Sequence, residues 1–186
     1  MLAKNTKLPL FPLNVVLFPG MMLPLHIFEE RYKIMIQECI DDQQPFGVIL
    51  AKSDRAQAPN VAGLVSDDIY GVGTTAHITA VEKMRDGRMN LMAVGQERFI
   101  VKDIFPSADD FLVGQVDPFP MSGSDDSEIV GLMTHKLRQL VKVYIGHLGD
   151  AAGEDLSEAV LPPDPTGLAF LAGAAMQGPL SDKQKL

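Results

Sequence analysis

Tryptophan, cysteine and histidine are scarce in this chain of 186 residues, which has none, one and four of them. With Cys39 as its single thiol, the chain cannot form an internal disulfide, and we expect a reducing, cytoplasmic location. Lysine and arginine number 16 against 24 acidic residues, which gives a net charge of −8. This balance disfavours nucleic acid as a partner, because sequence-independent binding relies on clustered cations that neutralise phosphates.

Motifs for catalysis and cofactor binding are also missing. The sequence has neither a G-x-x-x-x-G-K-[ST] loop nor a G-x-S-x-G motif. The histidines are scattered, and the segment that starts at His26 lacks the second histidine of the zinc motif H-x-x-E-H. Residues 71–76 fit a dinucleotide-binding pattern, but the residues that follow alternate like a strand, whereas that pattern needs a helix. We therefore predict no catalytic residues, no metal site and no cofactor.

An almost wholly apolar run, Leu8 to Leu25, carries prolines at 9, 12, 19 and 24. Prolines at this density break helices, which argues against a membrane-spanning segment. They also interrupt the apolar core of a secretory signal, and no small-residue cleavage site follows. We predict an edge strand at 8–13, a short buried strand at 15–18, a turn at Pro19-Gly20 and a second extended run at 23–27.

The next ninety residues are predicted to be mostly strands. In chain order, the predicted elements are a helix near 28–41, a central strand at 46–51, an exposed loop at 52–59, a long strand at 74–85, and strands at 88–94, 98–105 and 111–116. Asp86-Gly87 predicts a type I′ hairpin turn, Gly95-Gln96 a second tight connection, and Gly73 a bulge. Short strands joined by tight turns indicate a barrel or a sandwich.

After Pro120 the spacing of apolar residues becomes helical. It predicts a helix near 125–146, ended by Gly146 and Gly149, and a second helix at 165–177 with Pro165 in its first turn. A further helix starts at 181 and is cut off after about one turn, which suggests that the natural chain continues. We expect two domains, a β-rich subdomain at 1–120 and a helical subdomain at 121–186.

Several segments together resemble the N-terminal domain of Lon, the ATP-dependent protease La, in its standalone bacterial form. They are LPLFPLNVVLFPGMMLPLHIFEERY at 8–32, YGVGTTAHI at 70–78, DGRMNLMAVGQERFIV at 86–101 and the terminal PLSDKQKL. The resemblance implies an α+β fold, with a PUA-like β-barrel (pseudobarrel) and a packed helix followed by a C-terminal α-helical bundle. It also implies recognition of polypeptide substrates. Because the chain lacks ATPase and Ser-Lys peptidase signals, we do not expect an enzyme.

The resulting prediction is a non-catalytic module that binds unfolded or extended polypeptide, as an adaptor to a protease or chaperone. Its predicted binding residues are Met21, Met22, Pro24 and Phe46, since methionines beside a proline-bearing strand can form an adaptable apolar groove. Burial of these side chains in the core is the alternative interpretation. Two other functions stay open, RNA binding and small-ligand sensing, because PUA-like barrels include RNA-binding members and a barrel can hold a pocket.

Overall fold

The computed structural model describes residues 1–53, 56, 63–64, 66–121, 127–156 and 158–186. Most of the predicted loop at 52–59 and the predicted helix start at 125 lie outside these ranges. The chain divides into two units, Met1–Pro120 with Gln177–Leu186 and, separately, Met121–Met176. Within the described ranges, no helix combines the length and apolar character that crossing a membrane would require.

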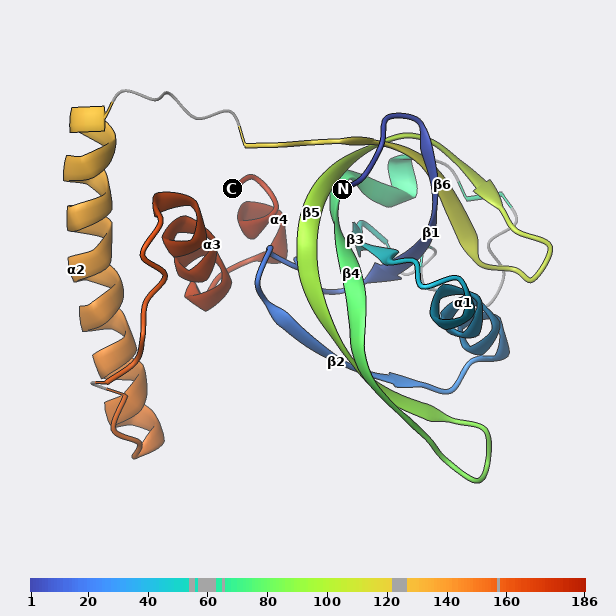
Figure 1. The fold of residues 1–186 in the computed structure, drawn as a ribbon, viewed down its shortest axis with the longest axis horizontal. Helices are drawn as coiled ribbons and strands as arrows, with labels where there is room; N and C mark the ends of the chain where they lie inside the picture. Colours follow the sequence, from blue (N-terminus) through green and yellow to red (C-terminus); the bar gives the residue numbers. More distant parts are fainter. Residues whose placement is uncertain (54–55, 57–62, 65, 122–126, 157) are drawn as a thin grey trace. The chain divides into compact units, whose positions relative to one another are not determined.

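The first unit contains six strands, one long helix and a short terminal helix (Figure 1). They are β1 (Thr6–Leu13), β2 (Met22–Ile27), α1 (Glu30–Asp41), β3 (Phe46–Ala51), β4 (Ile69–Lys83), β5 (Met89–Pro106), β6 (Leu112–Pro118) and α4 (Leu180–Lys183). A 3-10 turn, Ser66–Asp68, leads into β4. The predicted α+β architecture is confirmed.

The strands pair in the order β2-β5-β4-β3-β1-β6, and β6 also pairs with β5. Five strands therefore form a closed ring of pairings. The long strand β5 makes this possible, because its first half pairs with β2 and its second half with β6, while β4 runs along its other side. As a result, β2 is an edge strand that extends the ring.

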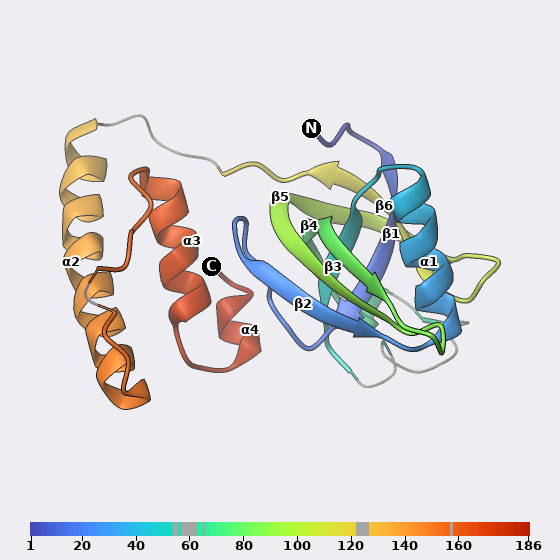
Figure 2. The same ribbon diagram turned by 60° about the horizontal axis from the view of Figure 1, so that its bottom comes forward.

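Helix α1 covers the sheet through one apolar face. Tyr32, Met35, Ile36 and Cys39 follow helical spacing and are all buried. They join a core cluster with residues of β2, β3 and β5, and Figure 2 shows the helix beside the sheet. The predicted central strand β3 is buried at every position. A second cluster, built around Phe99 and Ile49, fills the other part of the ring.

Two predictions for the proline-rich run are wrong. β1 is not an edge strand, because it pairs antiparallel with β6 at residues 6–10 and parallel with β3 at residues 10–13. The two ladders overlap only at Leu10, so Pro9 and Pro12 each stand where the strand is paired on one side. Residues 15–18 form no strand, although Leu17 and Phe18 are buried. The Thr74 hydroxyl donates to the Leu17 carbonyl at 2.6 Å, which gives a backbone carbonyl of this irregular segment a hydrogen-bond partner.

Two predicted turns also differ. Gly95-Gln96 does not connect two strands, because β5 continues through both residues. A Cβ at position 95 would meet the Phe18 carbonyl, so glycine permits a close approach of two backbones inside the strand. The hairpin at Asp86-Gly87 is present, but Gly87 has a φ of 82° while Asp86 is not in the positive-φ region. A turn followed by a left-handed glycine therefore replaces the predicted type I′ geometry.

The second unit consists of α2 (Ser127–Ala152) and α3 (Pro165–Ala175). α2 does not end at Gly146 but continues through Gly149, which is buried. Contacts to the segment before α3 and to α3 itself offset the low helix propensity of glycine: Arg138 donates to the Pro162 carbonyl at 2.7 Å, and the Tyr144 hydroxyl to the Ala175 carbonyl at 3.0 Å.

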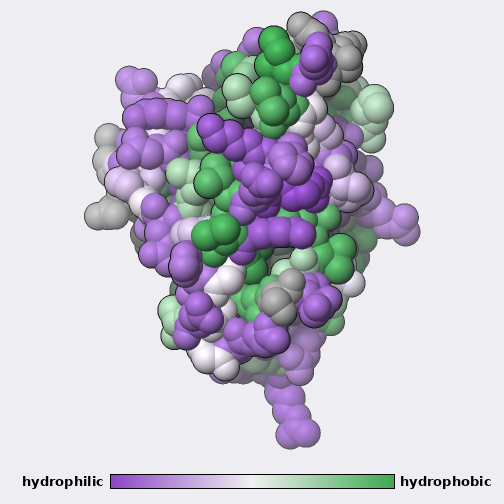
Figure 3. Space-filling model, turned by 90° about the vertical axis from the view of Figure 1, so that its left-hand side faces the viewer, coloured by the Kyte–Doolittle hydropathy of each residue, from purple (hydrophilic) through white to green (hydrophobic). Residues whose placement is uncertain are grey.

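The other face of α2 carries large apolar side chains that are exposed. Ile129, Leu132, Met133, Leu140 and Val143 are each about 60% exposed or more. Figure 3 looks onto α2, and apolar side chains there interrupt a mostly hydrophilic surface. The predicted stripe of apolar residues on this helix is therefore only partly buried.

Candidate functional site

Strand β2 presents two different faces. Met22, Pro24 and His26 are exposed, whereas Leu23 and Ile27 are buried and Leu25 is partly buried. This period of two is the ordinary alternation of a strand that covers a core on one side. The exposed face of β2 continues across β5 and β4, its neighbours in the sheet.

A groove of about 510 Å³ crosses these three strands. Its lining includes Pro24 and His26 of β2, Met92 and Asn90 of β5, and Ala80, Val81 and Glu82 of β4. We call this surface the β2 groove. Its volume is that of a site for a few side chains.

The register of the strands sorts the groove into two rows. In the first row Pro24 pairs with Met92, which pairs with Ala80, and all three side chains are apolar. In the second row, one step of two residues further along, His26 pairs with Asn90, which pairs with Glu82. Rows two residues apart are separated by about 7 Å. The groove therefore changes from apolar to polar along the direction of β2.

The polar row is held by hydrogen bonds between its side chains. His26 Nδ1 lies 2.7 Å from Asn90 Oδ1, and Asn90 Nδ2 donates to Glu82 Oε2 at 3.4 Å. Because the amide of Asn90 presents its oxygen to the imidazole, His26 Nδ1 carries the proton. Glu82 is the one charged residue among those that line the groove, so this end of the groove is anionic.

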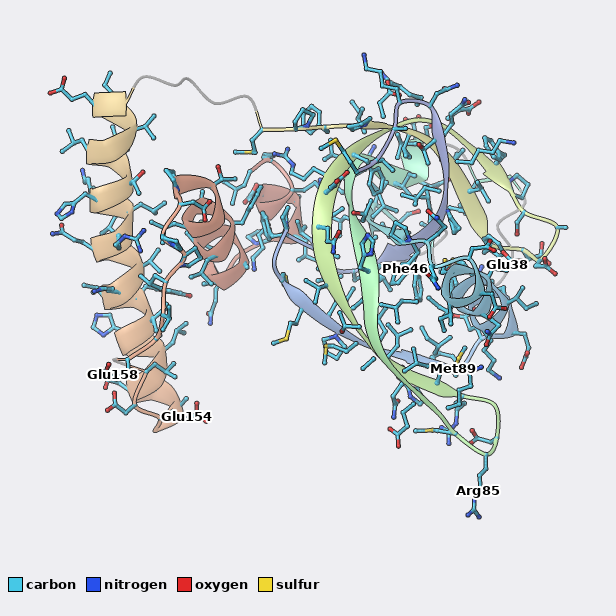
Figure 4. All side chains as sticks on the ribbon, in the orientation of Figure 1. Glu38, Phe46, Arg85, Met89, Glu154 and Glu158 are labelled. Carbon is cyan, nitrogen blue, oxygen red and sulfur yellow. The ribbon has the colours of Figure 1, made fainter. Side chains whose placement is uncertain are left out.

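The four predicted binding residues occupy different environments. Met22, 67% exposed, and Pro24 share the exposed face of β2. Met21 is partly buried against the core. Phe46 is fully buried, with its ring 6.2 Å from that of Phe11, and lies inside the unit in Figure 4. The structure brings only Met22 and Pro24 to the surface, and we do not include Phe46 in the site.

Sequence analysis missed the contributions of β4 and β5. Met92 lies on the strand that follows the Asp-Gly turn, and counting pairs outward from that turn would have placed it opposite Ala80 of β4. The helix predicted near 28–41 would begin at Phe28, but Phe28 precedes α1 and is 61% exposed, with its ring stacked 6.2 Å from that of His26. Its exposure could not be foreseen, because the helix begins two residues later than predicted.

The hairpin beyond the groove is fixed at its base and charged at its tip. Lys83 donates to the Gln37 side chain of α1 at 2.6 Å. Arg88 forms a 2.7 Å ion pair with Asp86, and this guanidinium holds the pKa of the Asp86 carboxyl below its usual range. Arg85 projects from the tip into solvent (Figure 4). These contacts hold β4 and β5 in the twisted pairing that forms the groove floor.

The single cysteine is not placed for nucleophilic chemistry. Cys39 is 3% exposed on the inner face of α1, and burial raises the pKa of its thiol to about 12. A thiol with that pKa stays protonated at neutral pH, and the thiolate is the nucleophilic form. Cys39 therefore serves as a packed apolar side chain.

Comparison with known proteins gives consistent matches along the chain. The family model of the ATP-dependent protease La (LON) substrate-binding domain matches residues 7–186. Lon protease 2 of Myxococcus xanthus is 29% identical over 180 residues, and Lon protease of Paraburkholderia phytofirmans is 36% identical over 104 residues, or 52% of this chain. The match to the Myxococcus protein covers 95% of this chain but 21% of that protein.

Two solved structures share the fold. A Lon N-terminal domain protein from Xanthomonas campestris has a TM-score of 0.56 at 25% identity, with 97% of this chain and 96% of that chain covered. The N-terminal domain of a Lon protease from the Mycobacterium avium complex has a TM-score of 0.69 at 15% identity, with 97% and 88% covered. The chain thus spans about a fifth of the curated relatives and nearly all of these two solved chains.

Proposed function

The chain belongs to the ATP-dependent protease La (LON) substrate-binding domain family, and we propose on this basis that it binds unfolded or extended polypeptide without catalysing a reaction. The β2 groove is the observation that carries the proposal. It places an apolar row beside a polar, anionic row on the edge of a sheet. Exposed apolar surface with a polar rim is typical of an interaction site.

The side chains of the groove suit a ligand of variable sequence. Met92 lines the groove and Met22 lies beside it on the exposed face of β2; both are unbranched and flexible, so they can adapt to different apolar side chains. Pro24 adds a rigid apolar wall that loses no side-chain entropy on binding. The combination favours recognition by general apolar character, which unfolded chains expose and folded proteins bury.

We further propose that the chain acts as an adaptor that presents polypeptide to a protease or chaperone. An adaptor needs a second surface for its partner, and the exposed apolar face of α2 supplies a candidate. The Lon relatives carry the matching segment within chains about five times as long, which supports a protease as the partner. Replacement of Leu132 and Leu140 by glutamate should then abolish delivery to the partner while polypeptide binding is retained.

The finer architecture also belongs to this proposal. We propose that the closed ring of five strands is a PUA-like barrel and that α2 and α3, in the unit Met121–Met176, form the helical bundle. The proposed division into subdomains 1–120 and 121–186 needs one adjustment, because residues 177–186 group with the sheet. A cytoplasmic location fits the single reduced thiol at Cys39.

RNA binding and ligand sensing have less support. The net charge of −8 opposes contact with phosphates. Arg138, in the basic part of α2, donates two hydrogen bonds to proline carbonyls and so has a structural role. The β2 groove is an open surface that involves an edge strand, which suits a chain better than an enclosed small molecule.

A titration with three probes tests the proposed function. The probes are reduced, carboxymethylated α-lactalbumin, which stays unfolded, native α-lactalbumin as the folded control, and a 20-nucleotide oligo-uridine at 50 and 200 mM salt. We expect saturable binding of the unfolded probe alone, measured by fluorescence anisotropy. Salt-dependent binding of RNA without binding of the unfolded probe would overturn the proposal in favour of RNA recognition.

A pair of methionine variants then locates the site. Met22→Glu places a charge on the apolar part of the binding face, and it should weaken binding about 10- to 150-fold, because the loss of one buried methionine is worth roughly 1.5–3 kcal/mol. Met176→Glu is the matched control, since Met176 is 51% exposed and lies in the other unit. Equal affinities of the two variants would exclude the exposed face of β2 at Met22 from the site.

A further inference from the structure

The backbone of β2 has a free edge whose pattern of donors and acceptors can be derived. The Gly95 N–H donates to the Met21 carbonyl at 3.0 Å, and this bond fixes the phase of the antiparallel ladder between β2 and β5. Residues 23, 25 and 27 therefore direct their N–H and C=O groups toward β5. Met22, Pro24 and His26 direct theirs away from the sheet.

This free edge is incomplete at one position. Met22 and His26 each offer an N–H and a carbonyl, but Pro24 offers only a carbonyl, because proline has no N–H. The edge thus has two donors and three acceptors. Among the described residues, no backbone hydrogen bond outside the ladder with β5 uses any of these five groups. An extended polypeptide is the ligand whose own backbone has the matching alternation of groups.

We propose that an extended polypeptide segment binds by adding to β2 as an antiparallel strand, with three alternate side chains on the groove face. This inference rests on the proposed function and specifies how it is carried out. Antiparallel pairing is more stable per residue than parallel pairing, which sets the direction. Five of the six edge hydrogen bonds can form, and the sixth is absent at Pro24.

The rows of the groove define which segment fits. In an antiparallel strand, the first of the three alternate residues lies opposite His26, whose row continues away from the added strand through Asn90 of β5 to Glu82 of β4. Glu82 lies three strands, or about 14 Å, from the added strand, so a lysine or arginine at this position is favoured by the field of the chain's net charge of −8 and not by an ion pair with Glu82. The second and third residues lie opposite Pro24 and Met22, where apolar side chains fit. The substrate class is a segment with a cation followed by apolar residues at alternate positions.

Pro24 also limits what the edge can bind. Edge strands that expose a full set of donors and acceptors tend to pair with other edges and aggregate, and a proline on the edge opposes this. The missing donor weakens every added strand by one hydrogen bond. The edge of β2 is therefore suited to transient binding of a flexible segment that releases it again.

Backbone methylation separates strand addition from side-chain contact alone. The probe is acetyl-Ser-Lys-Thr-Ile-Thr-Val-Ser-amide, in which lysine, isoleucine and valine would face the groove and point their N–H groups at β2. N-methylation of these three residues should weaken binding more than about tenfold, since each hydrogen bond contributes roughly 0.5–1.5 kcal/mol. N-methylation of the two threonines, whose N–H groups point outward, should leave the affinity within about twofold, well below the effect of one average hydrogen bond.

The possible results have distinct meanings. Equal affinity for the two methylated peptides, or loss only when the threonines are methylated, would overturn antiparallel strand addition but leave the proposed function intact. Absence of binding by the unmethylated peptide and by unfolded α-lactalbumin would overturn both. Isothermal titration calorimetry gives each affinity directly.

A substitution in the protein gives an independent test, in which the affinity for the peptide is expected to rise and not to fall. Pro24→Val restores the missing N–H at the free edge and keeps an apolar side chain in the groove. It should bind the unmethylated peptide about 2- to 10-fold more tightly, as expected for one added hydrogen bond. If Pro24 acts only through its side chain, affinity will fall or stay unchanged, which would contradict strand addition. Urea unfolding verifies that the variant is folded.

Discussion

Replacing Phe46 with leucine tests whether this residue belongs to the core or to the binding surface. Phe46 is 0% exposed, and its ring lies 6.2 Å from that of Phe11, which stacks at 4.0 Å on Tyr32. Leucine keeps most of the buried apolar area but removes an aromatic pair worth about 0.5–1.5 kcal/mol. The space it leaves unfilled adds up to about 1 kcal/mol. We expect Phe46→Leu to lower the free energy of unfolding by about 1–2 kcal/mol.

Two measurements on the same protein decide the question. For a chain of 186 residues, that loss corresponds to a fall in Tm of about 2–8 °C, which differential scanning calorimetry resolves. The affinity for unfolded α-lactalbumin, at a temperature where the variant is fully folded, should match that of the unchanged protein. A tenfold loss of affinity with no fall in Tm would show that Phe46 contacts the ligand and would refute the assignment to the core.

Three further substitutions test the packing that positions β2. Gly95→Ala should destabilise the fold by about 1–3 kcal/mol in urea unfolding, because its Cβ would meet the Phe18 carbonyl; an unchanged midpoint would show that the loop moves freely. Thr74→Val should cost about 1–3 kcal/mol, because it leaves the buried Leu17 carbonyl without its 2.6 Å hydrogen bond; a stability equal to that of the unchanged protein would mean that water replaces the hydroxyl. Burial raises the pKa of the Cys39 thiol from 9.0 to about 12. The buried, protonated thiol therefore contributes fully to the free energy of unfolding below pH 9, and this contribution is lost as the pH rises toward 12. The urea midpoint should therefore fall over this range, and less steeply in Cys39→Ala; equal slopes would contradict the effect of burial.

The sequence predicted those elements whose apolar pattern is local and complete. β3 is apolar at all six positions and flanked by polar residues, and it is a buried central strand. α1 shows apolar residues at helical spacing over three turns, which no strand could bury on one side. Each of these patterns admits a single secondary structure, so composition and period were enough.

Two glycines were predicted to end a strand or a helix but lie inside one, and the reason is a contact with another part of the chain. Gly95 was taken as a turn, but it lies inside β5, where the backbone of residues 17–18 passes close by. Gly149 was taken as a helix end, but α2 passes through it, and its carbonyl accepts a hydrogen bond from Glu154 at 2.9 Å. In both cases the missing side chain makes room for another part of the chain. At Gly95 this is the distant segment 17–18, and at Gly149 it is the segment that folds back after α2.

The candidate site could be predicted only in part, because it is assembled from three strands. Met22 and Pro24 were predicted because methionines beside a proline-bearing strand can form an adaptable apolar groove. Asn90 and Glu82 come to His26 through pairings that depend on the register of β4 and β5. The pairing of Glu82 with Asn90 follows from the Asp86-Gly87 hairpin, but the pairing of β5 with β2 joins strands more than 60 residues apart in sequence, and no local pattern specifies that register.

The prolines of the opening run show how one residue type marks different features according to the neighbours of its strand. Pro9 and Pro12 lie in β1, which has a partner on each side, and each stands where the ladder pairs the strand on one side. Pro24 lies in β2, which pairs only with β5, and the position of the missing proline N–H faces away from β5. A sequence rule that links proline to sheet edges is therefore right for Pro24 and wrong for the other two. What distinguishes them is the strand order, which places β2 outside the closed ring. Because the ring is closed by β5 and β6, β2 is the one strand of the sheet that can accept another, and Pro24 then sets how firmly it does so.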